Sequence, residues 1–472
     1  MSQPVLFNTL GRQLAPLDPV EPGVIRMYTC GPTVYNEVHI GNLRTFLFED
    51  LLRRSLQYLG YRVVQVMNLT DVDDKTILGA HRAGLTLPEY TGPFIESFQR
   101  DLDLLHMERP EHFPKATEHI PEIIDMILQL IERGYAYESD GSVFFSIARD
   151  ADYGRLSGFD LAQVRRGERV AHDEYGKDDV RDFALWKAVK PGEPAWDSPW
   201  GPGRPGWHIE CSAMSMKYLG ETFDLHCGGV DLIFPHHENE IAQSESATGQ
   251  PFVRHWVHSE HLIVDGQKMS KSLGNQYTLQ DLLDRGYSAR AIRYLILSVH
   301  YRQKLNFTFE SLEGAAGALR RVDEMRFRLA HTQEAGEPDT QLAGTVERLK
   351  ADFAAALADD LNAAAALAAL FVFVKEVNVA IEERRIGTGD RERILAALAD
   401  VDRVLAVLDP ADWAAESAPA EEDAAEIEAL IQARNDARKR RDFAEADRLR
   451  DEIAARGIVL EDTPQGTRWK RR

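Results

Sequence analysis

The sequence predicts an α/β protein: a doubly wound parallel domain with an insertion, followed by an all-α helical bundle and a small C-terminal unit. A strand, a glycine-containing loop and a helix follow one another near the N-terminus, which is typical of a parallel sheet. Short strand-like runs and charged loops interrupt this pattern between residues 135 and 190. Residues 311–409 are rich in Ala, Leu, Glu and Arg, as in a helix bundle. The length of 472 residues accommodates two to four such domains.

The first elements form a predicted βαβ unit over residues 23–67. GVIRMYTC is a β-rich run, residues 42–59 carry apolar side chains at helical spacing, and Gly60 follows as a helix stop. The run RVVQVMN is then the next strand. Residues 119–134 read as an amphipathic helix, after which the inserted subdomain begins.

The segment that joins the insertion to a second α/β stretch is rich in proline, glycine and tryptophan. Residues 190–207 hold three tryptophans, which are costly to leave in water, so we expect this segment to pack on a neighbouring surface. The second α/β stretch runs from about 207 to 260. Asp265 and Gly266 lie between short apolar runs and predict a tight hairpin.

Beyond residue 278 the pattern is helical almost to the end. After the bundle, residues 410–425 read as an acidic linker and residues 426–456 as one further helix. The closing residues, GIVLEDTPQGTRWKRR, read as a strand-like or extended tail.

Composition excludes several classes of protein. Apolar residues make up 44% and charged residues 28%, which excludes a disordered or fibrous chain. No run is expected to reach the roughly 20 apolar residues that span a bilayer, and the N-terminus lacks signal-peptide features, so we expect a cytoplasmic protein without a membrane partner. The net charge of −21 argues against nucleic acid, but residues 432–472 carry 12 Lys/Arg against 8 Asp/Glu. That basic end suits an anionic polymer, or it is a solvated helix face.

Two loops carry residues that suit phosphates. CGPTVYNEVHIGNLR places His39 and Gly41 at the start of a helix, where backbone N–H groups and the positive helix end favour anions. Lys268 and Lys271, with Ser270 between them, lie in a glycine-flanked loop that can enclose a polyphosphate. Taken singly, a histidine near a helix start is usually a capping or core residue, and a lysine- and serine-containing run of the second kind is more often an exposed basic loop.

Three cysteines in a chain of this length do not make a disulfide scaffold, so metal binding, catalysis or burial are the alternatives. His236 and Glu240 are spaced i and i+4 in FPHHENEIAQ, which places them on one helix face. With Cys30 and Cys211 they make a donor set that zinc accepts. The spacing is not that of a zinc finger, and taken alone it leaves the metal open. Cys227 reads as a small buried residue.

The sequence resembles the class I aminoacyl-tRNA synthetases. His39-Ile40-Gly41-Asn42 matches their His-Ile-Gly-His tetrad except at Asn42, and residues 268–272 give their Lys-Met-Ser-Lys-Ser pentad intact. Within that class, the runs TCGPTVYNEVHIGN, NLTDVDDKT, PGWHIECSAM, FPHHENEIAQS and KMSKSLGN look like cysteinyl-tRNA synthetases over nearly the whole chain.

The resemblance implies roles for single residues. One Zn²⁺ per chain would be held by Cys30, Cys211, His236 and Glu240. Thr70 and Trp207 would line the cysteine pocket, and His208 and His226 would lie near the zinc or be buried neutral histidines. His237 is expected to point away from the ligands. ATP, with Mg²⁺, would be bound by His39, Gly41, Asn42, Lys268, Ser270 and Lys271, of which His39 and Lys271 would be catalytic.

The resemblance also implies a reaction and a division into domains. L-cysteine would be activated with ATP to cysteinyl-adenylate and transferred to tRNA(Cys), with Zn²⁺ recognising the substrate thiolate, by a monomer. The domains would be a Rossmann-type catalytic domain at 1–260 (insertion about 120–200), the KMSKS and stem-contact region at 261–310, a tRNA-binding bundle at 311–409 and an anticodon-binding region at 426–472. Two alternatives stay open: a ligase that joins cysteine to an amino sugar, and a zinc-dependent RNA-binding module.

Overall fold

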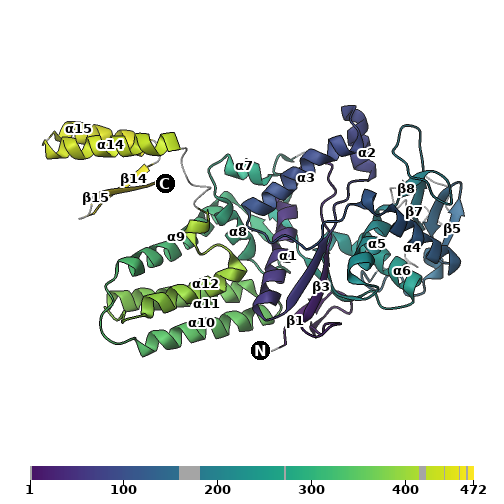
Figure 1. Cartoon of the computed structure of the whole chain (residues 1–472), viewed down its shortest axis with the longest axis horizontal. Helices are drawn as coiled ribbons and strands as arrows, with labels where there is room; N and C mark the ends of the chain where they lie inside the picture. The colour runs from purple at the N-terminus through teal and green to yellow at the C-terminus, as the bar shows by residue number, and fades with distance from the viewer. Residues whose placement is uncertain are drawn as a thin grey trace. The chain divides into compact units, whose positions relative to one another are not determined.

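The structure is a computed structural model that describes residues 3–158, 181–270, 273–413, 421–440, 442–455, 458–463 and 466–471. The contacts divide the chain into two compact units, Met1–Asp409 and Pro410–Arg472. The first unit contains the sheets and helices that surround the candidate site (Figure 1).

The first unit is built on a four-stranded parallel sheet in the order β10–β9–β3–β4. Its strands are β3 (Val24–Thr29), β4 (Arg62–Met67), β9 (Phe223–Gly229) and β10 (Val253–Ser259). The chain passes from β3 to β4 on one side and later returns as β9 on the other side. The predicted doubly wound sheet is therefore confirmed, and β3 is its switch point, where open α/β sheets bind ligands.

Helices cover both faces of this sheet. Helix α1 (Ile40–Tyr58) packs on β4, β9 and β10, whereas α5 (Trp207–Leu219) packs on β3 and β4, and Figure 1 shows them on opposite sides. The predicted helix stop is confirmed, since α1 ends just before Gly60, whose φ of 97° favours glycine. The other helices of this part are α2 (Asp74–Ala83), α3 (Leu87–Leu104) and α6 (Glu238–Thr248).

The segment predicted as an insertion forms an antiparallel sheet in the order β5–β6–β7–β8. Its elements are α4 (Ile120–Glu132), β5 (Ala136–Ser139), β6 (Ser142–Phe145), β7 (Phe183–Ala188) and β8 (Gly203–Pro205). The tryptophan-rich segment packs as expected, because Trp196 and Trp200 lie against the core cluster that contains Trp186. Trp196 is also held through backbone hydrogen bonds of 2.7 and 3.0 Å with Gly203.

Three small sheets complete the strands of the chain. β1 (Val5–Asn8) pairs with β2 (Gln13–Pro16) near the N-terminus. β11 (Leu262–Val264) forms the predicted tight hairpin with β12 (Gln267–Lys268), since Asp265 and Gly266 both have positive φ. β13 (Leu305–Phe307) adds to β11 in parallel. The third sheet lies in the C-terminal unit.

The predicted helical bundle is present. Its helices are α9 (Phe309–His331), α10 (Thr340–Ala358), α11 (Ala363–Glu382) and α12 (Asp390–Leu405), and they are preceded by α7 (Leu279–Leu283) and α8 (Ala289–Leu297). Among the described residues, α11 alone is long and apolar enough to cross a bilayer, so the expectation that no run has this character is wrong. Its buried side chains, including Leu370, Phe373 and Val377, belong to the core of the bundle, where α11 packs on α9 and α10.

A buried arginine joins the bundle to the parallel sheet. Arg293 of α8 is fully buried and donates to Asp50 Oδ2 of α1 at 2.6 Å. It also donates to the carbonyls of Leu405 and Leu105 at 2.8 and 2.9 Å. Burial alone would raise the pKa of Asp50, but Arg293 and Arg54 overcome this effect and hold that pKa below its usual value.

The described part of the C-terminal unit contains two α-helices, α14 (Glu421–Lys439) and α15 (Phe443–Ala455), where the sequence predicted one helix over 426–456. The helix is interrupted because Asp442 caps α15: its carboxylate accepts the N–H of Glu445 at 3.2 Å. The closing residues form a hairpin of β14 (Ile458–Thr463) and β15 (Gly466–Arg471), so the strand-like reading is confirmed and the extended one is wrong.

Candidate active site and metal centre

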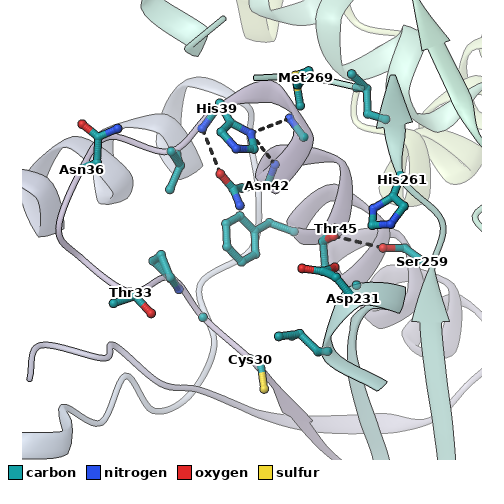
Figure 2. Close-up of a pocket in the computed structure, with 18 of the residues that line it drawn as sticks. Cys30, Thr33, Asn36, His39, Asn42, Thr45, Asp231, Ser259, His261 and Met269 are labelled. Atoms are coloured by element: carbon teal, nitrogen blue, oxygen red, sulfur yellow. Dashed lines mark hydrogen bonds between the residues drawn. The ribbon is translucent and has the colours of Figure 1, made fainter. Parts of the chain in front are cut away.

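A cavity of about 640 Å³ lies at the carboxyl ends of the parallel strands. It is lined by the loops after β3, β4 and β9, the starts of α1 and α5, and the β11–β12 hairpin. The residues predicted as functional that line it are Cys30, His39, Gly41, Asn42, Thr70, Trp207, Cys211, His236 and Lys268. Figure 2 shows part of this lining, with Cys30 at one end and Met269 at the other. The fold thus brings both signature loops and three of the four predicted metal ligands to one cavity.

His39 caps the first turn of α1. Its Nδ1 atom accepts the backbone N–H groups of Gly41 and Asn42 at 3.1 and 3.2 Å (Figure 2). Because Nδ1 accepts, a neutral His39 ring carries its proton on Nε2. The Asn42 carboxamide oxygen accepts the N–H of His39 at 3.1 Å, which completes a capping box. Asn42 therefore orients His39 through the backbone, a function that needs no charged side chain.

Gly41 brings the second signature loop close to the helix start. A Cβ atom at Gly41 would lie 2.3 Å from Met269 Cε, so any larger residue would require the flexible end of the Met269 side chain to move. Ser270 lies next to Met269, and its backbone N–H donates to Asn275 Oδ1 at 2.9 Å. Ser270 does not line the cavity. Lys271 and Ser272 lie outside the described residues, so their placement is not stated.

The four predicted metal ligands converge at the base of the cavity. Cys30 follows β3, Cys211 lies in α5, and His236 and Glu240 lie in and after a π-helical turn (Ile233–His237). One donor atom from each lies within 4.8 Å of all the others, and all four side chains are buried. Figure 2 shows the Cys30 sulfur among the cavity residues.

The chemistry of this cluster suits zinc. Two sulfurs, an imidazole nitrogen and a carboxylate oxygen form a donor set that Zn²⁺ accepts. Glu240 Oε1 is buried without a hydrogen-bond partner, although His236 Nε2 lies 3.1 Å away. Burial raises the pKa of both the Cys30 thiol and the Glu240 carboxyl, so a cation is needed to keep these groups ionised together. The residues present therefore fit a zinc ion.

A second possible set combines Cys30 and Glu240 with His226 and His237. The prediction that His237 points away from the ligands is wrong: its Nε2 atom lies 3.4 Å from Cys30 Sγ. The physical reason is that His237 precedes Glu240 by three residues, a spacing that places both side chains on the same helix face, and both His236 and His237 are buried. His226 and His237 do not line the cavity, whereas Cys211 and His236 do, so the first set is the one that a substrate can reach.

Comparisons with known proteins identify the family. Residues 16–317 match the model of the tRNA synthetases class I (C) catalytic domain, residues 352–409 the DALR domain, and residues 421–469 the cysteinyl-tRNA ligase anticodon binding domain. The cysteine–tRNA ligase of Solibacter usitatus is 49% identical over 466 residues, which cover 99% of each chain. The chain belongs to the cysteine–tRNA ligase family. The enzyme of Chlamydia trachomatis serovar A, another member, is 46% identical over 484 residues, again 99% of each chain.

Solved structures of related synthetases show the same fold. Mycobacterium tuberculosis methionyl-tRNA synthetase in complex with methionyl-adenylate superposes with a TM-score of 0.59 at 16% identity, covering 82% of this chain and 90% of that one. The ternary complex of Agrobacterium radiobacter LeuRS gives a TM-score of 0.57 at 13% identity, covering 86% of each chain. These similarities support the α/β catalytic domain followed by helices.

Buried histidines surround the cluster in this member of the family. His226 Nε2 lies 2.8 Å from Glu240 Oε2, and His208 Nδ1 lies 2.9 Å from His236 Nδ1. His237 is bonded to His258, whose other nitrogen lies 2.7 Å from Thr9 Oγ1. Burial lowers the pKa of His226 and His258 to about 3. Both are therefore neutral at pH 7 and add no repulsion to a cation.

Several cavity residues were missed by sequence reasoning. They are Lys75, Asp231, Ser259, His261 and Lys304. Most of them could have been predicted from their positions at or just after strand ends: Asp231 follows β9, and Ser259 is the last residue of β10. Thr45 Oγ1 and Ser259 Oγ lie 3.1 Å apart across the cavity wall, as Figure 2 shows.

Proposed function

We propose that the 640 Å³ cavity is where this ligase activates L-cysteine with ATP and transfers it to tRNA(Cys). Membership of the family gives the overall activity, the ligation of cysteine to tRNA. The observation that supports the location is the convergence of the His39 loop, Lys268 and the candidate metal ligands, which are far apart in sequence, on one cavity.

Two steps are proposed. The cysteine carboxylate attacks the α-phosphate of ATP, forming cysteinyl-adenylate and releasing pyrophosphate. The terminal 2′-hydroxyl of the tRNA then attacks the acyl carbon, and AMP leaves. His39, Lys268 and Lys271 would stabilise charge on the phosphates, and Mg²⁺ would accompany ATP. Such chemistry depends mainly on positioning and charge stabilisation.

The cysteine side chain would be recognised at the base of the cavity. We propose that Zn²⁺ is held by Cys30, Cys211, His236 and Glu240; when bound, it favours a thiolate over an alcohol. The chain's own residues orient these ligands: Trp207 stacks on His236 with ring centroids 4.2 Å apart. Thr70, which lines the cavity, is oriented by Asn68 Nδ2 donating to its hydroxyl oxygen at 3.0 Å.

The experiment that tests this function is charging of tRNA(Cys) with radiolabelled cysteine, with zinc content measured in the same preparation. We expect charging and about one zinc per chain. Charging of an amino sugar instead of tRNA would favour the first alternative reading. Zinc and RNA binding without pyrophosphate exchange would favour the binding module.

Lys271→Ala is expected to reduce cysteine-dependent pyrophosphate exchange while zinc content and thermal stability stay unchanged. One electrostatic contact that acts on the transition state contributes a factor of about 100–1,000, and the loss should appear in kcat. Lys190→Ala is the control, because Lys190 is exposed and does not line the cavity. Near-normal exchange in Lys271→Ala would remove this residue from the catalytic group.

Truncation after Pro419 is expected to spare cysteine activation and to weaken tRNA charging. The deletion removes most of the Pro410–Arg472 unit and the net-positive end but no candidate zinc or ATP residue. Stacking of a single unpaired base contributes about 1–3 kcal/mol, so the KM for tRNA should rise at least about tenfold. An unchanged KM for tRNA would exclude residues 426–472 as the anticodon-binding region.

A further inference from the structure

A carboxylate on the metal-bearing helix binds a loop of the insertion. Glu238 is the first residue of α6 and is almost completely buried. Its Oε1 atom accepts the backbone N–H groups of Gly154 and Leu156 at 3.0 and 3.4 Å, and its Oε2 atom accepts that of Ser157 at 2.7 Å. Three N–H donors can stabilise a buried carboxylate in the absence of a counter-ion.

The same loop is attached to α6 a second time and contributes one residue to the core cluster that contains two candidate ligands. Tyr153 donates its hydroxyl hydrogen to Asn239 Oδ1 at 2.5 Å. Leu156 is buried in the core cluster that also contains Cys30 and Cys211. We call residues 153–157 the anchor turn. It is hydrogen-bonded to α6, and its Leu156 belongs to the same core cluster as two candidate ligands.

The anchor turn and the metal ligands use different sides of the same helical turn. His236 and Glu240 are separated by four residues, and their side chains meet. Glu238 lies midway between them in sequence, about 200° around the helix from each. The position of His236 and Glu240 therefore depends on how this helical turn is rotated about the helix axis and shifted along it. Glu238 fixes both the rotation and the shift through its hydrogen bonds to the anchor turn.

We propose that Glu238 is a positioning residue: through the anchor turn it holds α6 in the orientation in which His236 and Glu240 bind zinc. A change in the anchor turn of the insertion then alters the positions of the candidate metal ligands as well. The inference rests on the proposed zinc site. Residues that orient metal ligands without touching the metal commonly contribute a factor of about 10–100 to metal affinity.

The test compares Glu238→Gln with the wild-type full-length holoenzyme. Gln keeps the shape and one acceptor oxygen but loses the charge. We expect the amides of residues 154, 156 and 157 to exchange hydrogen about 10–100 times faster, as for loss of a hydrogen bond to a charged acceptor. We expect the zinc dissociation constant, measured by chelator competition well below the unfolding temperature, to rise at least about tenfold. The KM for cysteine should rise more than kcat falls.

Glu245→Gln is the matched control. Glu245 lies on the same helix and pairs with Arg155 of the same turn, but at a partly exposed site. Because this variant removes a weaker, partly exposed attachment of the same turn, amide exchange at 154–157 and the zinc dissociation constant should change by less than about fivefold.

A purely structural role for Glu238 predicts lower thermal stability with an unchanged zinc dissociation constant in the folded variant, and that result would overturn the proposal. Unchanged exchange at the three amides would overturn it as well. If Glu238→Gln fails to fold, Tyr153→Phe decides by the same criteria, because it removes the second attachment and no buried charge. A wild-type protein without zinc would instead refute the metal assignment, since the exchange measurement does not depend on metal.

Discussion

Replacing Cys211 by serine is expected to remove zinc from the protein and to reduce its preference for cysteine over serine. Cys211 contributes one of four converging donor atoms, and an alcohol gives up its proton far less readily than a thiol. Residues that only orient a metal ligand contribute a factor of about 10–100 to metal affinity. Loss of a direct ligand should therefore reduce that affinity by more than this factor. Shape alone discriminates poorly between close analogues, so selectivity should fall with the zinc.

The measurements are zinc content and pyrophosphate exchange with cysteine and with serine. Cys227→Ser is the matched control, since Cys227 is equally buried but belongs to neither ligand set. It should keep its zinc and its selectivity. A Cys211→Ser protein that still holds one zinc per chain would contradict the ligand assignment. A Co²⁺-substituted enzyme whose spectrum does not change on saturation with cysteine would contradict recognition of the thiolate.

Arg293→Met is expected to destabilise the protein by about 3 kcal/mol. Breaking a buried ion pair typically costs about 3–5 kcal/mol, because the remaining charge is left buried. We expect the lower end of this range because the Arg54 guanidinium, 3.0 Å from the Asp50 carboxylate, still neutralises part of its charge. Denaturant unfolding at pH 7 would give this value if the transition is two-state. Arg348→Met is the control: Arg348 pairs with Glu376 at an exposed site, where a pair contributes less than about 1 kcal/mol.

The same variant should change the dependence of stability on pH. The pKa of Asp50 lies below its unfolded value in the wild type. Its contribution to stability is therefore present above a pH of about 4 and is lost as the pH falls through the folded-state pKa. Arg293→Met should reduce this acid dependence, and adding Asp50→Asn should recover part of the lost stability. A double variant no more stable than Arg293→Met would exclude the ion pair as the cause.

Local patterns predicted the elements that local forces determine. The helix after β3, its end at Gly60 and the hairpin at Asp265 were all found, because apolar spacing and positive-φ turns act over a few residues. The candidate ligand set was assembled from donor chemistry, but only the family resemblance assigned it to one zinc site, since nothing in the spacing of Cys30 and Cys211 indicates that β3 and α5 meet. Their meeting is a consequence of the sheet order.

Other features were missed although a signal was available. His237 precedes Glu240 by three residues, which places both side chains on one helix face, but only the i, i+4 pair of His236 and Glu240 was taken into account. The two helices of the C-terminal unit were read as one because their break contains neither proline nor glycine; Asp442 followed by Glu445 was the available signal. The apolar character of α11 was missed because Lys375 and Glu376 interrupt the apolar run inside the helix, although its length and composition suffice.

The order of strands in the central sheet also determines when, during synthesis of the chain, the candidate metal ligands can come together. β3 lies at the middle of the sheet, but its neighbour β9 is synthesised nearly 200 residues later, and Glu240 follows Cys30 by about 210 residues. At a translation rate of about 5–20 residues per second, the Cys30 thiol waits about 10–40 s for its last partner. During that interval the burial that raises its pKa is absent, so the nascent chain carries an ordinary reactive thiol. The four candidate ligands therefore come together only late in the synthesis of the chain.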